Sequence, residues 1–107
     1  MIITCVHVYV KPGFADEFIA ITKKNHEGTI KEPGNIRFDF IRSADDPNRF
    51  MLYEVFRGQA DINAHKTTAH YLAWRDAVAG WMDKPREGVR YEAVEPLDEM
   101  KWKYAGK

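Results

Sequence analysis

The chain has 107 residues, a length typical of one domain, and 45% of them are hydrophobic and 30% charged. Sixteen basic and sixteen acidic side chains leave a formal net charge of +0, which argues against a general nucleic-acid binder and against a polybasic membrane-surface protein. No apolar run reaches the roughly 18 residues of a membrane helix, and the single cysteine cannot form an internal disulfide. The apolar N-terminus lacks the basic leader of a signal peptide, so we expect a cytoplasmic protein.

Alternating and helical hydrophobic patterns predict six elements joined by short connections. They are strands over 2–10, 35–42, 49–57 and 88–95, a helix over 14–31, and a helical segment over 59–83 with a break at Thr67-Thr68. The order β-α-β-β-α-β is typical of an α+β, ferredoxin-like fold, in which a four-stranded antiparallel sheet carries both helices on one face.

The first and third predicted strands are apolar on both faces, so helices on one side would leave an apolar sheet face uncovered. A second copy of the sheet is the simplest cover, and we therefore predict a homodimer through this face. We expect residues 1–97 to form the domain and residues 98–107 to form a C-terminal tail. The tail contains Trp102 and Tyr104, which we expect to pack on the partner subunit.

Two charged residues interrupt the apolar second strand. Arg37 and Asp39 are two positions apart, so they share one face of a strand that we expect to be covered on both faces. An internal salt bridge or an exposed edge pair explains them as well as a functional site does. In the third strand, the hairpin register decides whether Glu54 or Tyr53 lies opposite Arg37, and the sequence leaves both registers open.

Asn25 and His26 lie at the end of the first predicted helix, on or beside its buried stripe. Side chains at this place commonly bond the last free carbonyls of a helix. By themselves they do not indicate a site.

The segment from His65 to Tyr71 is denser in polar groups and crosses the expected helix break. His65 and His70 flank Lys66. A satisfied core histidine and a solvated lysine would explain this pattern, but a lysine and a histidine beside a cleft also suit a phosphate or an enolate oxygen. The five-residue spacing of the histidines, with no carboxylate in the segment, argues against a metal site.

Several of these residues belong to motifs of a known family. The chain resembles the antibiotic biosynthesis monooxygenase (ABM) domain family of dimeric α+β barrels, and the resemblance covers residues 2–96. The motifs that carry it are Glu32-Pro33-Gly34, Tyr53-Glu54 and His65-x-x-Thr68-x-His70-Tyr71-x-x-Trp74.

Further stretches resemble one branch of that family, the phospho-autoinducer-2 isomerases. They include Asn25-His26-x-Gly28, Gly34-Asn35-Ile36-Arg37-Phe38-Asp39 and His65-Lys66-Thr67-Thr68. The chain departs from the family at Ala69, where a proline is common, and in the tail after Pro96. Both departures are compatible with a relative that takes a different substrate.

The resemblance implies a cofactor-free and metal-free isomerase of a small phosphorylated hydroxy-diketone, the 5-phosphate of 4-hydroxypentane-2,3-dione. Proton transfer through an enediol would give the 3-hydroxy-2,4-dione. The implied roles are a proton shuttle at His65 or Asp39, and neutralisation of the phosphate or enolate by Lys66 and Arg37. The remaining implied site residues orient the dione oxygens or line the pocket, and they are Asn25, His26, Tyr53, Glu54, His70 and Tyr71.

Two other functions fit the same fold, because fold does not determine function. One is a cofactor-independent ABM-type monooxygenase acting on a quinol or phenol, for which the aromatic content is suitable. The other is a non-catalytic ligand-binding dimer. The polar set favours proton-transfer chemistry over both.

Overall fold

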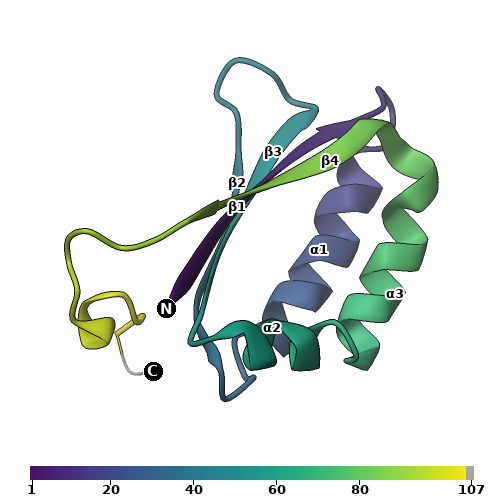
Figure 1. Cartoon of the computed structure of the whole chain (residues 1–107). Helices are drawn as coiled ribbons and strands as arrows, with labels where there is room; N and C mark the ends of the chain where they lie inside the picture. The colour runs from purple at the N-terminus through teal and green to yellow at the C-terminus, as the bar shows by residue number, and fades with distance from the viewer. Residues whose placement is uncertain (106–107) are drawn as a thin grey trace.

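A single antiparallel sheet with helices on one face forms the body of the protein, seen in a computed structural model that describes residues 1–105 (Figure 1). The strand order is β2-β3-β1-β4. The elements are β1 (Ile2–Val10), α1 (Ala15–Thr29), β2 (Asn35–Arg42), β3 (Arg49–Phe56), α2 (Gln59–His65), α3 (Ala69–Val78), the 3₁₀ turn η1 (Ala79–Trp81), β4 (Met82–Tyr91) and the 3₁₀ turn η2 (Glu99–Lys101). The predicted α+β, ferredoxin-like class is confirmed.

The predicted break in the second helical segment separates α2 from α3. Thr68 is the N-cap of α3, where its Oγ1 accepts a hydrogen bond of 3.3 Å from the backbone N–H of Tyr71. A threonine at this position satisfies one of the free N–H groups of the new helix. The break therefore places His65 at the end of one helix and His70 at the start of the next.

The last strand begins earlier than predicted. β4 starts at Met82, where the sequence indicated a helix to residue 83, and it ends at Tyr91 instead of residue 95. Pro85, which cannot continue a helix, lies inside β4. A proline is tolerated there because β4 is an edge strand that pairs only with β1, and the register is irregular between His7 and Tyr9.

The main core fills the space between the helices and the sheet. Phe18 on α1, Phe38 on β2 and Val78 on α3 have no exposed surface, and Trp74 is 3% exposed. The Trp74 Nε1–H donates a 3.0 Å hydrogen bond to Thr22 Oγ1, so the polar edge of this buried indole is satisfied. α1 and α3 are thereby locked side by side over the sheet.

The register of the β2–β3 hairpin differs from both alternatives that the sequence left open. Arg37 pairs with Val55, because an irregularity between Asn35 and Arg37 shifts the ladder. Glu54 lies opposite Phe38 and also opposite Thr4 of β1, so its side chain faces the helices. Arg37 therefore points to the other face of the sheet.

Among residues 1–105, no α-helix covers that other face, which we call the open face (Figure 1). Part of it is covered by the C-terminal tail of the same chain: Trp102 packs with Tyr53 against a small cluster of Ile3, Ile36 and Val55. The predicted contact of the tail with a partner subunit stays a prediction, and residues 106–107 of the tail lie outside the described residues. Within residues 1–105, the helices are too short or too polar to cross a membrane.

Candidate functional site

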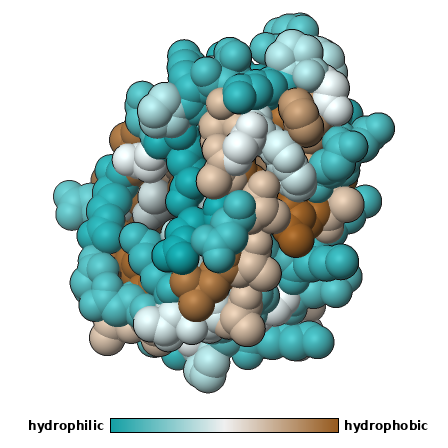
Figure 2. All heavy atoms as spheres, turned by 90° about the vertical axis from the view of Figure 1, so that its right-hand side faces the viewer, coloured by the Kyte–Doolittle hydropathy of each residue, from teal (hydrophilic) through white to brown (hydrophobic). Residues whose placement is uncertain are grey.

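A cavity of about 320 Å³ lies between the helices and the sheet. Its size is at the lower end of the range for small-molecule sites, about 300–1,000 Å³. The polar side chains among its lining residues include Asn25, Glu54, His65 and Lys66. Figure 2 shows the helix-covered side of the molecule, where hydrophilic residues dominate and apolar residues lie in strips between them.

His65 is the most constrained polar group of this cavity. It is the last residue of α2 and is only 3% exposed. Its Nδ1 lies 2.7 Å from Glu32 Oε2, so the carboxylate accepts the Nδ1–H hydrogen bond. This bond assigns the proton of the neutral ring to Nδ1 and leaves a lone pair on Nε2.

The free nitrogen of His65 faces a carboxyl group. His65 Nε2 lies 3.9 Å from Glu54 Oε1, a separation too long for a hydrogen bond. Burial raises the pKa of the Glu54 carboxyl to about 7, against the opposing effect of the Lys66 and Arg86 charges. Burial also lowers the pKa of His65, although its hydrogen bond to Glu32 acts in the opposite direction.

These opposite shifts assign opposite roles to the two groups. Near neutral pH a large fraction of Glu54 carries a proton, while His65 is a neutral base. A pair of titratable groups whose environments hold one protonated and the other unprotonated is the usual equipment for acid–base catalysis.

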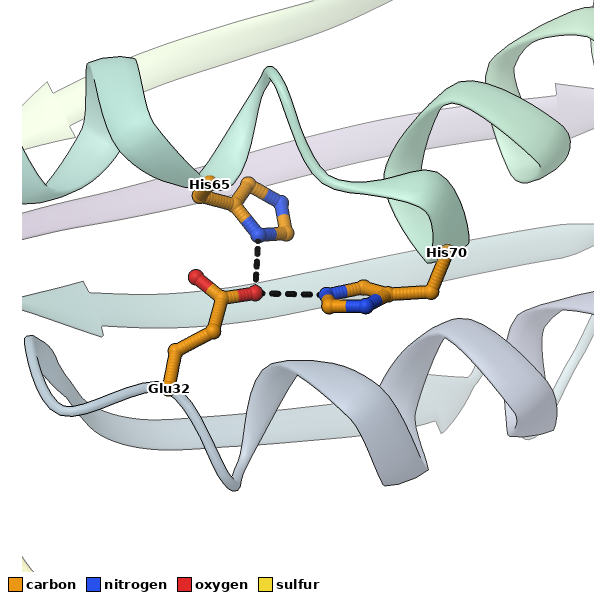
Figure 3. A group of neighbouring side chains, drawn as sticks. All are labelled: Glu32, His65 and His70. Atoms are coloured by element: carbon orange, nitrogen blue, oxygen red, sulfur yellow. Dashed lines mark hydrogen bonds and ion pairs between the residues drawn. The ribbon is translucent and has the colours of Figure 1, made fainter.

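A second histidine, His70, helps to hold Glu32 in place. His70 Nε2 lies 2.6 Å from the same Oε2 atom of Glu32, so the carboxylate oxygen accepts two hydrogen bonds, one from each ring (Figure 3). The His70 ring lies against Gly28 of α1, where an added Cβ would come within 2.5 Å of ring atoms. Gly28 therefore provides the space that lets His70 reach Glu32.

Glu32, His65 and His70 also have the composition of a metal site, since their ligand atoms lie within 4.8 Å of one another. Glu32 is the carboxylate whose absence from the histidine segment argued against a metal. The two nitrogens lie 2.6 and 2.7 Å from one oxygen, which is hydrogen-bond spacing. Ligands around a metal at about 2.1 Å are about 3 Å or more apart, so we read the cluster as hydrogen-bonded.

The structure brings together about half of the site residues that the sequence suggested. Asn25, Glu54, His65, Lys66 and Tyr71 line the cavity, and His70 acts one contact behind it through Glu32. Their assignment as site residues stays a prediction. His26 lies elsewhere: its Nε2–H donates to the Phe38 carbonyl at 2.7 Å, at the free edge of β2.

Arg37, Asp39 and Tyr53 lie on the open face and do not reach the cavity. Arg37 Nε donates to Asp39 Oδ2 at 2.7 Å, and the Tyr104 hydroxyl of the tail lies 2.5 Å from Asp39 Oδ1. Trp102 stacks on Tyr53 with 6.4 Å between ring centroids. Burial and the Asp39 hydrogen bond raise the pKa of Tyr104 to about 12, so its hydroxyl stays a donor. Within this cluster, the charges of Arg37 and Asp39 neutralise each other.

Sequence reasoning missed three charged residues near the cavity. Glu32 belongs to a motif that carries the family resemblance, but its role depends on contacts with His65 and His70, more than thirty positions away in the sequence. Arg86 and Arg90 of β4 also line the cavity. Their alternation with Gly88 would have placed them on one face, but the predicted strand began too late to include Arg86.

The comparisons with known proteins agree on the family. The family model described as antibiotic biosynthesis monooxygenase matches residues 1–77. An isomerase from Klebsiella pneumoniae, named for (4S)-4-hydroxy-5-phosphonooxypentane-2,3-dione, is 39% identical over 87 residues, which are 81% of this chain and 89% of that protein. The protein of the same name from Yersinia enterocolitica is 35% identical over 96 residues, 90% of this chain and all of that protein.

Solved structures give the same result. A Nitrosomonas europaea protein, named as a candidate antibiotic biosynthesis monooxygenase, is 52% identical and superposes with a TM-score of 0.86, covering 88% of this chain and 99% of that one. A Mycobacterium tuberculosis protein at 20% identity shares the fold, with a TM-score of 0.84 and coverage of 91% and 98%. The chain belongs to the antibiotic biosynthesis monooxygenase family.

Proposed function

We propose that the protein is an isomerase of a small phosphorylated hydroxy-diketone, of the kind named for its relatives, (4S)-4-hydroxy-5-phosphonooxypentane-2,3-dione. The observation that carries the proposal is the pairing of His65 Nε2 with Glu54 across 3.9 Å in the cavity. One group is a base and the other an acid, and at 3.9 Å apart they can contact neighbouring atoms of one substrate molecule.

The reaction moves one proton between neighbouring carbons. His65 Nε2 takes the proton from C4, the carbon with the hydroxyl, while the Glu54 carboxyl gives its proton to the C3 carbonyl oxygen. The C4–H bond breaks, a C3=C4 double bond forms, and the enediol is neutral. In the second half the Glu54 carboxylate takes the proton of the C4 hydroxyl, and the protonated His65 returns a proton to C3. The product is the 3-hydroxy-2,4-dione, and both residues regain their starting states.

Glu32 and His70 support this cycle without touching the substrate. The charge of Glu32 stabilises the imidazolium that His65 becomes in the enediol state, and its hydrogen bond holds the ring orientation. The bond from His70 fixes the carboxylate in turn. We assign Lys66 to the negative charge that develops on the enediol oxygens, because it is the ammonium group among the lining residues.

The exposed apolar side chains of the open face support the predicted homodimer. Ile41 and Tyr91 are about half exposed, and Cys5, His7 and Met51 are only partly buried, because they lie on the open face. A second copy packed on this face would bury them. A cytoplasmic location agrees with the charged substrate, because a phosphate ester does not cross a membrane unaided.

Proton NMR of the protein with the phosphorylated hydroxy-dione in deuterated buffer tests the proposal. We expect the 3-hydroxy-2,4-dione to appear with deuterium at C3, because a protonated His65 exchanges with solvent before it returns the proton. A folded protein that gives neither product nor exchange would contradict the isomerase, and oxygen consumption with quinols would then support the monooxygenase.

A further inference from the structure

Three cations gather around the cavity, and within residues 1–105 none of them has a carboxylate oxygen within 4.0 Å. Lys66 comes from the end of α2, and Arg86 and Arg90 come from β4. In a chain whose formal net charge is +0, this is a local excess of positive charge. The carboxyl among the lining residues is Glu54, whose pKa is raised to about 7, so that about half of it is uncharged at that pH.

Arg86 and Arg90 are the two arginines that line the cavity, and, like Arg42 and Arg49 elsewhere in residues 1–105, neither forms an ion pair. Arg37, Arg57 and Arg75 each form an ion pair with an acidic side chain, at 2.7, 3.1 and 3.2 Å. Among residues 1–105, Arg86 and Arg90 are in no ion pair within 4.0 Å. The Arg86 guanidinium instead lies over the Trp74 ring at 5.0 Å from its centroid, which orients it without neutralising its charge.

The strand geometry leaves space between the two guanidinium groups. Arg86, Gly88 and Arg90 alternate along β4, so all three face the helices. A Cβ at Gly88 would meet Thr4 Cγ2 at an ordinary 3.7 Å, so the backbone does not require glycine here. The missing side chain instead leaves a gap between the two arginines.

The sheet fixes the position of Arg90 relative to the Glu54 carboxyl. Thr4 of β1 pairs with Glu54 on one side and with Arg90 on the other. Glu54 and Arg90 are therefore in one row across the sheet, with Cα atoms two strand spacings or about 10 Å apart. Together with their side chains, this separation suits a short carbon chain that carries reacting oxygens at one end and an anion at the other.

We propose that Arg86 and Arg90, with Gly88 between them, bind the phosphate monoester of the substrate. This inference rests on the proposed function, because it assigns the end of the substrate that does not react. Two guanidinium groups bind a phosphate dianion through charge-assisted and bidentate hydrogen bonds. The phosphate fixes the position of the carbon chain, so the C4 proton lies at His65 in each binding event.

Isothermal titration with dihydroxyacetone phosphate and with dihydroxyacetone tests the subsite without turnover. We expect the wild-type protein to bind the phosphate ester at least about tenfold more tightly than the free ketone. Arg90→Gln should weaken binding of the ester about tenfold and leave the free ketone unchanged. Lys84→Gln is the matched control: it removes one charge from the same strand, but Lys84 lies over Tyr9 on the open face.

Gly88→Val provides a test that keeps both charges. A branched side chain fills the gap, and it suits a strand, so the fold should persist. We expect it to weaken ester binding as much as Arg90→Gln does. Equal binding of the ester and the ketone by the wild-type protein, or equal effects of Arg90→Gln and Lys84→Gln, would overturn the subsite.

The two proposals fail separately. If the wild-type protein distinguishes the ester from the ketone through Arg90 but does not isomerise the hydroxy-dione, the phosphate subsite stands and the isomerase falls. If isomerisation occurs and Arg90→Gln leaves KM for the hydroxy-dione unchanged, the isomerase stands and the phosphate subsite falls.

Discussion

The two faces of the sheet each hold a polar cluster, and the clusters differ in what they do with their charges. On the open face, Arg37 pairs with Asp39, and the tail adds Tyr104 and an aromatic cover. On the helix side, His65 and Glu54 face each other across a gap, beside a cavity. Asp39 and Tyr104 also line a cavity, of about 420 Å³, so an adjoining space does not by itself separate the two clusters. What separates them is that hydrogen bonds within the open-face cluster already hold the Arg37 and Asp39 charges together.

The largest expected effect within this comparison is that of Lys66→Met. If Lys66 stabilises the developing enediol charge, we expect kcat to fall by about 10²–10³. Lys24→Met is the control, because Lys24 is an exposed lysine of α1 that does not line the cavity. Equal activity of the two variants in the NMR assay would remove Lys66 from the mechanism.

Glu54→Gln should lower kcat by about 10² and change the pH profile. The acid acts in its protonated form, so wild-type activity should fall as pH rises through about 7. On the acid side, activity should fall once His65 is protonated, below its ordinary titration range, because burial lowers the pKa of His65. The variant should lose the alkaline limb alone. A variant with both limbs intact would assign the acid to another group.

The same substitution has an opposite effect on stability. The pKa of Glu54 is near 4.5 in an unfolded chain and about 7 in the fold, so ionisation destabilises the fold as pH rises between these values. The loss is about 3 kcal/mol when complete. Urea denaturation should show Glu54→Gln to be more stable than the wild type at pH 8, with a smaller difference at pH 5. An equal difference at both values would contradict the buried acid.

Gly28→Ala tests the support behind His65. The added Cβ would overlap the His70 ring, so we expect a several-fold loss of kcat with KM nearly unchanged. Gly80→Ala is the control, because nothing lies within 4 Å of an added Cβ there. In a His70→Ala background, Gly28→Ala should not lower kcat further, and a double-mutant cycle measures this. Additive losses would separate Gly28 from His70.

The smallest expected effect on activity lies on the open face. Tyr104→Phe removes a hydroxyl that bonds Asp39 and the Phe38 carbonyl. We expect the free energy of unfolding to fall by about 1–2 kcal/mol, since the Asp39 carboxylate loses a partner. The value of kcat/KM should stay within about twofold. A tenfold loss would show that the open face takes part in the reaction.

The sequence predicted elements well where the pattern is local. The alternation in residues 2–10 predicted the bounds of β1, and the boundary at Gly34 predicted the start of β2. The predicted helix break at Thr67-Thr68 contains the residue that caps α3. The prediction failed at β4, where Pro85 resembles a boundary but is tolerated at a sheet edge.

The candidate site was only half predictable for a physical reason. His65 and Lys66 stand out as neighbours in the chain, whereas Glu32 becomes a partner of His65 only through the packing of the loop after α1. In the sequence, Arg37 and Asp39 are charged residues within an apolar strand, as Glu54 is. Which of them faces the cavity depends on a one-residue irregularity in the β2–β3 register.

The most direct test of the central claim compares two single variants in the NMR isomerisation assay, His65→Asn and Asp39→Asn, since each residue is a candidate base on a different face. We predict that His65→Asn lowers the rate at least about 10²-fold and that Asp39→Asn keeps it within about threefold. A large loss in Asp39→Asn with activity retained in His65→Asn would contradict the account and move the chemistry to the open face.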